Sequence, residues 1–131
     1  MRQPVPAFAG TRAAGLLIGV AGASAVLLGA FGAHALAGVL DAQGRELWRT
    51  ASQYHFWHAL ALALVFALPG HQRTRCWAVG AFAIGIVLFS GSLYALALGA
   101  PRWCGAVTPF GGVAFVVGWV ALGLSQARRS H

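Results

Sequence analysis

Four apolar runs fill most of this chain, and only short polar segments join them. They cover residues 13–36, 54–68, 77–100 and 109–127. A helix needs about 20 mainly apolar residues to cross the hydrocarbon core of a bilayer. The shortest run reaches that length only if its helix starts upstream, and Asp41 is placed to cap a helix that begins near Ala42. Thr108 and Pro109 similarly predict an N-cap followed by proline in the first turn of the last helix.

Composition agrees with a lipid environment. Hydrophobic residues make up 59% of the 131 residues and charged residues 8%, whereas a soluble domain carries about 25% charged residues. The net charge of +7 comes from nine arginines in the joints and tails. This distribution argues against nucleic acid and suits lipid headgroups. We therefore predict an all-α fold, an integral membrane four-transmembrane-helix bundle with short joints, whose main partner is the lipid bilayer.

The same pattern predicts domain organisation and topology. We expect a basic N-terminal tail at 1–12, a single four-helix transmembrane domain at 13–127 and a basic C-terminal tail at 128–131. The first run resembles a signal peptide, but it is longer than the 7–15 apolar residues of a signal peptide, so we expect it to stay as a span. Six arginines would share a side with both termini and three would lie opposite. The positive-inside rule then places both termini in the cytoplasm.

Five polar side chains lie near the ends of the runs that would share one membrane face. They are His34, His58, Ser90, Tyr94 and Thr108. Polar side chains within spans usually face the bundle interior and find partners there. We therefore expect a candidate polar cluster in the outer half of the bundle, with His34 close to His58. Structural hydrogen bonding and a functional site both remain open interpretations.

We assign no catalytic, cofactor-binding or metal-binding residues. Zinc would need three or four ligands in a tetrahedral array, and only His55 and His58 have a local spacing. A haem between His34 and one of these histidines has no further signature. Proton-coupled export would need a membrane-embedded carboxylate, but Asp41 and Glu46 both lie in the first joint. We therefore expect no cofactor and lean against an enzyme.

Small residues spaced four apart predict where helices touch. Helices in lipid approach closely where glycine, alanine or serine lines the contact. Gly15 and Gly19 have this spacing in the first run, Gly85 belongs to such a stripe in the third, and Gly118 to one in the fourth. We expect Gly15, Gly19 and Gly85 to lie at helix–helix contacts.

Four short sequence blocks follow one another along the chain in a characteristic order. They are LGAFGAH at 28–34, WxT at 48–50 with YxxWH at 54–58, LFSGSLY at 88–94, and VTPFGG at 107–112 with GW at 118–119, where x is any residue. Together they resemble the YgdD-like family of small bacterial inner-membrane proteins, a domain of unknown function. The resemblance implies a multi-pass protein of the bacterial inner (plasma) membrane with no established activity. The five residues of the predicted cluster fall on motif positions, and His55 does not.

Two classes of function stay open. In the first, the protein is a binding, assembly or accessory module that holds a lipid, a quinone-like ligand or a membrane-protein partner. In the second, it is a small transporter or enzyme that uses the polar His/Ser/Tyr/Thr cluster. The missing embedded carboxylate and the lack of an obvious nucleophile favour the first class.

Overall fold

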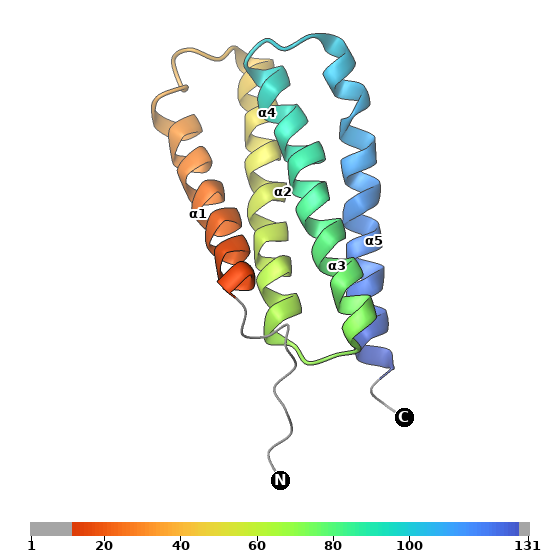
Figure 1. The fold of residues 1–131 in the computed structure, drawn as a ribbon. Helices are drawn as coiled ribbons and strands as arrows, with labels where there is room; N and C mark the ends of the chain where they lie inside the picture. The colour runs from red at the N-terminus through yellow and green to blue at the C-terminus, as the bar shows by residue number, and fades with distance from the viewer. Residues whose placement is uncertain (1–11, 129–131) are drawn as a thin grey trace.

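The computed structural model describes residues 12–128, so the predicted tails lie outside it except for Arg12 and Arg128. This part of the chain is helical except for its short connections and contains no strand. The elements are α1 (Arg12–His34), α2 (Ala42–Ala67), α3 (Gln72–Gly85), the π-helix η1 (Ile86–Ser90), α4 (Gly91–Ala97), the 3-10 helix η2 (Arg102–Ala106) and α5 (Thr108–Ala127). Because α3, η1 and α4 follow one another without a break, the fold has four helical rods (Figure 1).

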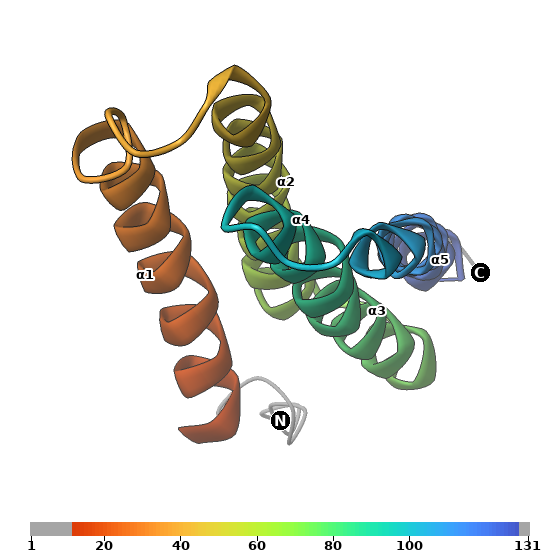
Figure 2. The same ribbon diagram turned by 90° about the horizontal axis from the view of Figure 1, so that it is seen from above.

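The four rods run side by side along one axis (Figure 1). The upper end of the bundle in that view holds the α1–α2 and α4–α5 connections, and the lower end holds the α2–α3 connection. Seen from above, α1 lies at one side, α5 at the other, and α2 with α3–α4 between them (Figure 2). Helix α1 packs mainly against α2, whereas α5 packs against α3 and η1. Helix α1 is therefore the peripheral element of the fold.

Three segments of the described chain are long and apolar enough to cross a membrane: Arg12–His34, Gln72–Ala97 and Arg102–Ala127. Helix α2 is not among them, because polar side chains continue along it as far as His58. It is nevertheless an interior helix, with Leu62 and Val65 fully buried. The predicted all-helical membrane bundle is confirmed at this level.

The two predicted helix starts have different outcomes. Helix α2 begins at Ala42 as expected, and Asp41 Oδ1 accepts a hydrogen bond from the Gly44 amide at 2.7 Å. Thr108 is already the first residue of α5 and caps nothing. Its Oγ1 lies 2.6 Å from Ser92 Oγ, so this hydroxyl joins α5 to α4. The prediction of a Thr108 cap was wrong because a tertiary partner takes the hydroxyl.

Glycines of α3 and α5 receive aromatic residues of the opposite helix. A Cβ atom added at any of three glycines would overlap its neighbour. The pairs are Gly118 with the Phe82 ring, Gly85 with the Phe115 ring, and Gly111 with the backbone of Phe89. The predicted contact at Gly85 is confirmed. Because two of the pairs place a ring against a glycine, the helices interlock and do not merely touch.

Helix α1 contradicts the prediction for its glycine stripe. Gly15 and Gly19 are exposed, and a Cβ atom at either would meet nothing within 4 Å. The helix turns a different pair of small residues inward, Ala21 and Ala25, both of which are buried. In a run this rich in glycine and alanine the four-residue spacing recurs on more than one face, so spacing alone could not select the contact.

The turn between α2 and α3 is closed by a buried arginine. Pro69 has no N–H, so it cannot donate to the Val65 carbonyl as a helical residue at that position would. Arg75 is only 1% exposed, and its Nε and Nη2 donate to Val65 O at 3.2 and 3.0 Å. Gln126 Nε2 donates to Pro69 O at 2.9 Å, which attaches the end of α5 to the same turn. Side chains thus supply hydrogen-bond donors to carbonyls at this turn, where α2 ends and the helical N–H donors stop.

The glycine contacts generate a matched pair of variants. Gly111→Ala places a methyl group against the Phe89 backbone, which cannot retreat cheaply. We expect it to reduce the free energy of unfolding by about 1–3 kcal/mol, the usual cost of overpacking. Gly19→Ala is the control, because its methyl group enters open space. Unfolding in mixed detergent micelles measures both, and equal stabilities would contradict the proposed role of Gly111.

Candidate functional site

The five residues of the predicted cluster do not form one hydrogen-bonded group. The hydrogen bonds made by His58, Ser90, Tyr94 and Thr108 all go to other residues. His34 is exposed in the last turn of α1. The expectation of a single polar knot is therefore corrected, and a functional role for these residues stays a prediction.

Helix register separates the two histidines that were expected to meet. Near its upper end α1 lies against α2 with Gly32 beside Trp48. His34 lies beyond that contact, whereas His58 comes ten residues after Trp48, about 15 Å along the helix. His58 is also nine residues from Arg49 and ten from Leu68. It thus lies about midway between the last arginine of α2 and the end of the helix, not at the upper end of α2.

His58 is enclosed by aromatic residues and has both ring nitrogens occupied. Nδ1 lies 2.7 Å from Tyr54 O, and a carbonyl can only accept, so Nδ1 donates. Nε2 then accepts from Trp119 Nε1–H at 3.2 Å. The ring stacks on Phe115 with centroids 3.5 Å apart. This pattern describes a neutral imidazole with a structural role that joins α2 to α5.

His55 is the centre of a polar line that crosses three helices. It is 4% exposed, with Nε2 3.1 Å from Ser24 Oγ of α1 and Nδ1 3.1 Å from the Tyr94 hydroxyl of α4. Ser24 Oγ donates to Ala21 O at 3.1 Å, so Nε2–H must donate to Ser24. Nδ1 then accepts from the Tyr94 hydroxyl. We call Ser24, His55 and Tyr94 the polar line.

Sequence reasoning missed Ser24 and set His55 aside. The signal for Ser24 was present, because it is the only hydrogen-bonding side chain between Arg12 and His34. His55 was set aside because it fell outside the motif positions. Tyr94 was expected to contribute, and it does so through His55 rather than through His58.

The remaining predicted residues tie helices together beside the polar line. Ser90, the last residue of the π-helix η1, is fully buried and donates to Ala51 O of α2 at 2.8 Å. Thr108 pairs with Ser92 as described above. A π-helix inside an α-helical rod is rare and often marks a functional position. Here η1 joins α3 to α4 and packs against α2 and α5.

A lateral groove of about 400 Å³ opens beside the polar line, between α1 and the α3–η1–α4 rod. Its walls are apolar and include Val20 of α1 and Val87 of η1. Among the described residues that line it, Ser24, His55 and Tyr94 are the polar side chains. The groove therefore combines an apolar channel with one short hydrogen-bonding strip, an arrangement typical of small-molecule sites.

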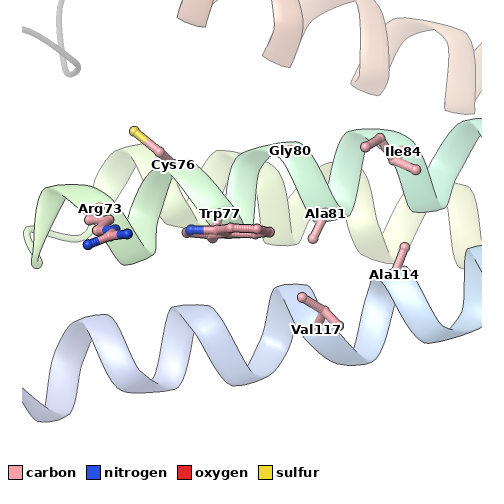
Figure 3. A pocket seen from close by; sticks show the side chains of 8 residues that line it. All are labelled: Arg73, Cys76, Trp77, Gly80, Ala81, Ile84, Ala114 and Val117. Atoms are coloured by element: carbon pink, nitrogen blue, oxygen red, sulfur yellow. The ribbon is translucent and has the colours of Figure 1, made fainter.

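A second groove, of about 450 Å³, runs between α3 and α5. Figure 3 shows Trp77 lying between the two helices, with Arg73 at one end and Cys76 on the side away from α5. The rest of the lining is apolar or small, including Gly80 and Ala114. This groove offers mainly hydrocarbon contact, and its hydrogen-bonding side chains, Arg73, Cys76 and Trp77, come from α3 alone, so it carries less chemical information than the lateral groove.

Metal ligation finds no support in this part of the chain. Among residues 12–128, no three His, Cys, Asp or Glu side chains come together. His55 and His58, the one pair with local spacing, turn to different helices, to α1 and α4 in one case and to α5 in the other.

The fold and these grooves define the class of the protein. It is a small helical membrane protein with grooves between its helices and buried interhelical hydrogen bonds. Residues 28–112 match the family model described as "Protein of unknown function (DUF423)". The chain belongs to this family.

Relatives place the chain among uncharacterised membrane proteins. It is 45% identical over 104 residues to the UPF0382 membrane protein YwdK of Bacillus subtilis, covering 75% of this chain and 82% of the relative. It is 42% identical over 100 residues to the UPF0382 inner membrane protein YgdD of Escherichia coli, covering 74% and 76%. A Haemophilus influenzae UPF0382 membrane protein is 37% identical over 107 residues, covering 81% and 86%. No solved structure matches. The resemblance to the YgdD-like family is confirmed.

The different surroundings of the two histidines lead to a prediction. His58→Leu removes the partner of the Trp119 N–H and the donor to Tyr54 O, so we expect a loss of about 1–3 kcal/mol in the free energy of unfolding. His34→Leu changes an exposed side chain and should stay within about 0.5 kcal/mol of the parent. Unfolding in mixed micelles compares them. Equal losses would refute the separate environments.

Proposed function

We propose that this protein is a binding module of the bacterial inner membrane that holds a hydrophobic, quinone-like molecule in its lateral groove. The observation that carries the proposal is the polar line of Ser24, His55 and Tyr94 inside an otherwise apolar groove. The proposal includes a four-span domain at 13–127 with both termini in the cytoplasm.

Four spans are supported by the position and ends of α2. This helix lies between α1 and the α3–α4 rod (Figure 2). It follows α1 and precedes α3 in the chain and runs antiparallel to both (Figure 1). Its polar side chains at His55 and His58 have partners inside the bundle, so they need not contact lipid. The arginine asymmetry between the two ends supports the orientation. The Escherichia coli relative is named an inner membrane protein.

The depth of the polar line favours a ligand that dissolves in the hydrocarbon core. His55 lies six residues after Arg49, about 9 Å further along α2. Phospholipid ester groups stay near the headgroups, but a quinone ring can enter the core with its carbonyl oxygens. The Tyr94 hydroxyl lies 3.1 Å from His55 Nδ1 and 3.4 Å from Ser52 Oγ. The hydroxyl has a single proton, which can turn from His55 or Ser52 toward a carbonyl oxygen in the groove.

Hydrogen-bond directions favour binding over acyl chemistry. Ser24 and His55 could suggest a nucleophile and its base. However, the Ser24 hydroxyl donates to Ala21 O and accepts from His55, so the imidazole is not placed to remove its proton. Serine that bonds back to its own helix in this way is a common structural arrangement.

Thiol labelling tests the topology. Under the proposed orientation Cys104 lies at the outer end of the bundle, and Cys76 lies near the cytoplasmic end. An impermeant maleimide should modify Cys104 in spheroplasts and reach Cys76 only after permeabilisation. Single-cysteine variants, Cys76→Ser and Cys104→Ser, assign each signal. The reverse pattern would overturn the orientation.

Quinone titration tests the groove. Decylubiquinone should quench tryptophan fluorescence of the purified protein saturably, because Trp48 packs against Tyr94 as a tilted pair with ring centroids 4.6 Å apart. Gly91 lines the groove, and a Cβ atom added there meets nothing within 4 Å. The side chain of Gly91→Leu should therefore occupy the groove and weaken quinone binding at least tenfold. Tyr94→Phe should weaken it by removing the hydroxyl alone.

Gly123→Leu is the control for the groove variant, because it adds the same side chain to open space on α5. It should bind like the parent. Equal quenching of the parent, Gly91→Leu and Gly123→Leu would mean that the quinone partitions into the micelle, and the proposed site would be rejected.

A further inference from the structure

A third hollow, of about 360 Å³, lies between the upper ends of α1 and α2. We call it the arginine pocket, because Arg45 and Arg49 are the charged residues of its lining. It shares no lining residue with the lateral groove. The two hollows are therefore separate sites on the same pair of helices.

The arginine pocket concentrates positive charge on one helix face. Arg45 and Arg49 are four residues apart on α2, so their side chains lie on the same face. No acidic side chain lines the pocket. The nearby Asp41 carboxylate caps α2 through the Gly44 amide. Arg45 Nη1 donates to Leu40 O at 2.7 Å, which fixes this guanidinium while its other N–H groups remain able to donate.

Small residues keep the α1 side of the pocket open and apolar, and Ser52 and Gln53 add polar groups from α2. Gly29, Gly32 and Ala33 of α1 form its wall. Trp48 is held in place because its Nε1–H donates to Leu28 O at 2.9 Å, and its ring occupies the space where a Gly32 side chain would be. The pocket thus has a cationic mouth and an apolar body on the lipid-facing side of two helices.

We propose that the arginine pocket binds an anionic phospholipid, with its phosphate between Arg45 and Arg49 and an acyl chain along the small residues of α1. Guanidinium groups match phosphate oxygens in charge and geometry. Basic pockets between membrane helices are suited to anionic headgroups. Two cations with no acidic side chain beside them among the described lining residues favour phosphatidylglycerol over phosphatidylcholine, whose ammonium group would meet the arginines without a counter-charge. The apolar body favours a lipid over free phosphate.

Lipid titration of the full chain in neutral detergent tests this proposal. Phosphatidylglycerol should raise the melting temperature in a saturable way and stay bound in native mass spectrometry. Phosphatidylcholine with the same acyl chains, and inorganic phosphate alone, should bind at least tenfold more weakly. Equal binding of phosphatidylcholine would show a general lipid effect and overturn the proposal. Equal binding of inorganic phosphate would show an anion site and overturn the lipid assignment.

Charge-matched variants locate the site. The double variant Arg45→Gln/Arg49→Gln should weaken phosphatidylglycerol binding at least tenfold. Arg49→Gln alone should weaken it without disturbing the Arg45 bond to Leu40. The control Arg73→Gln/Arg102→Gln removes the same charge from exposed positions outside the pocket and should bind like the parent. If the control loses binding equally, bulk charge explains the effect and the arginine pocket is rejected.

Discussion

Wherever a helix of a membrane protein is interrupted, the carbonyl that loses its helical partner needs a hydrogen-bond donor from the protein, because lipid supplies none. This bundle meets the need with side chains borrowed from other elements. At the Pro69 turn, Arg75 bonds the Val65 carbonyl that has lost its helical donor. Between helices, Ser90 of the π-helix donates to Ala51 O of α2. Each such bond also fixes the position of two segments. The polar residues of the helices thus serve mainly to hold the helices in place against one another.

This constraint explains why the least hydrophobic helix lies at the centre. The polar side chains of α2 would be costly against lipid. Inside the bundle His55 bonds to α1 and α4, and His58 bonds to α5. Helix α2 therefore connects three neighbours through two residues that are only three positions apart. In contrast, α3 and α5 interlock by fitting phenylalanine rings against glycines, with little polar contact. The bundle therefore combines two modes of packing: hydrogen bonds join α2 to its neighbours, and ring-against-glycine contacts join α3 to α5.

Sequence predicted the elements better than their rotations. Run lengths and caps anticipated the helices and the start of α2 at Ala42, and glycine spacing found the contact at Gly85. Grouping polar residues by their place along the runs failed for His34 and His58, since run ends do not fix the register between helices. It also missed that a three-residue offset turns His55 and His58 by about 60° relative to each other. That rotation sends them to different helices.

The peripheral position of α1 has a consequence for ligand choice. Lipid tails are as apolar as the groove walls, so apolar contact alone gives a ligand little advantage over the bilayer. Discrimination must then come from the few hydrogen-bonding groups that the groove exposes. Ser24 is the one such group on α1, and it faces His55. In the proposed function, a molecule that bonds to the polar line gains what a lipid tail cannot, so this short strip, rather than the volume of the groove, would determine specificity.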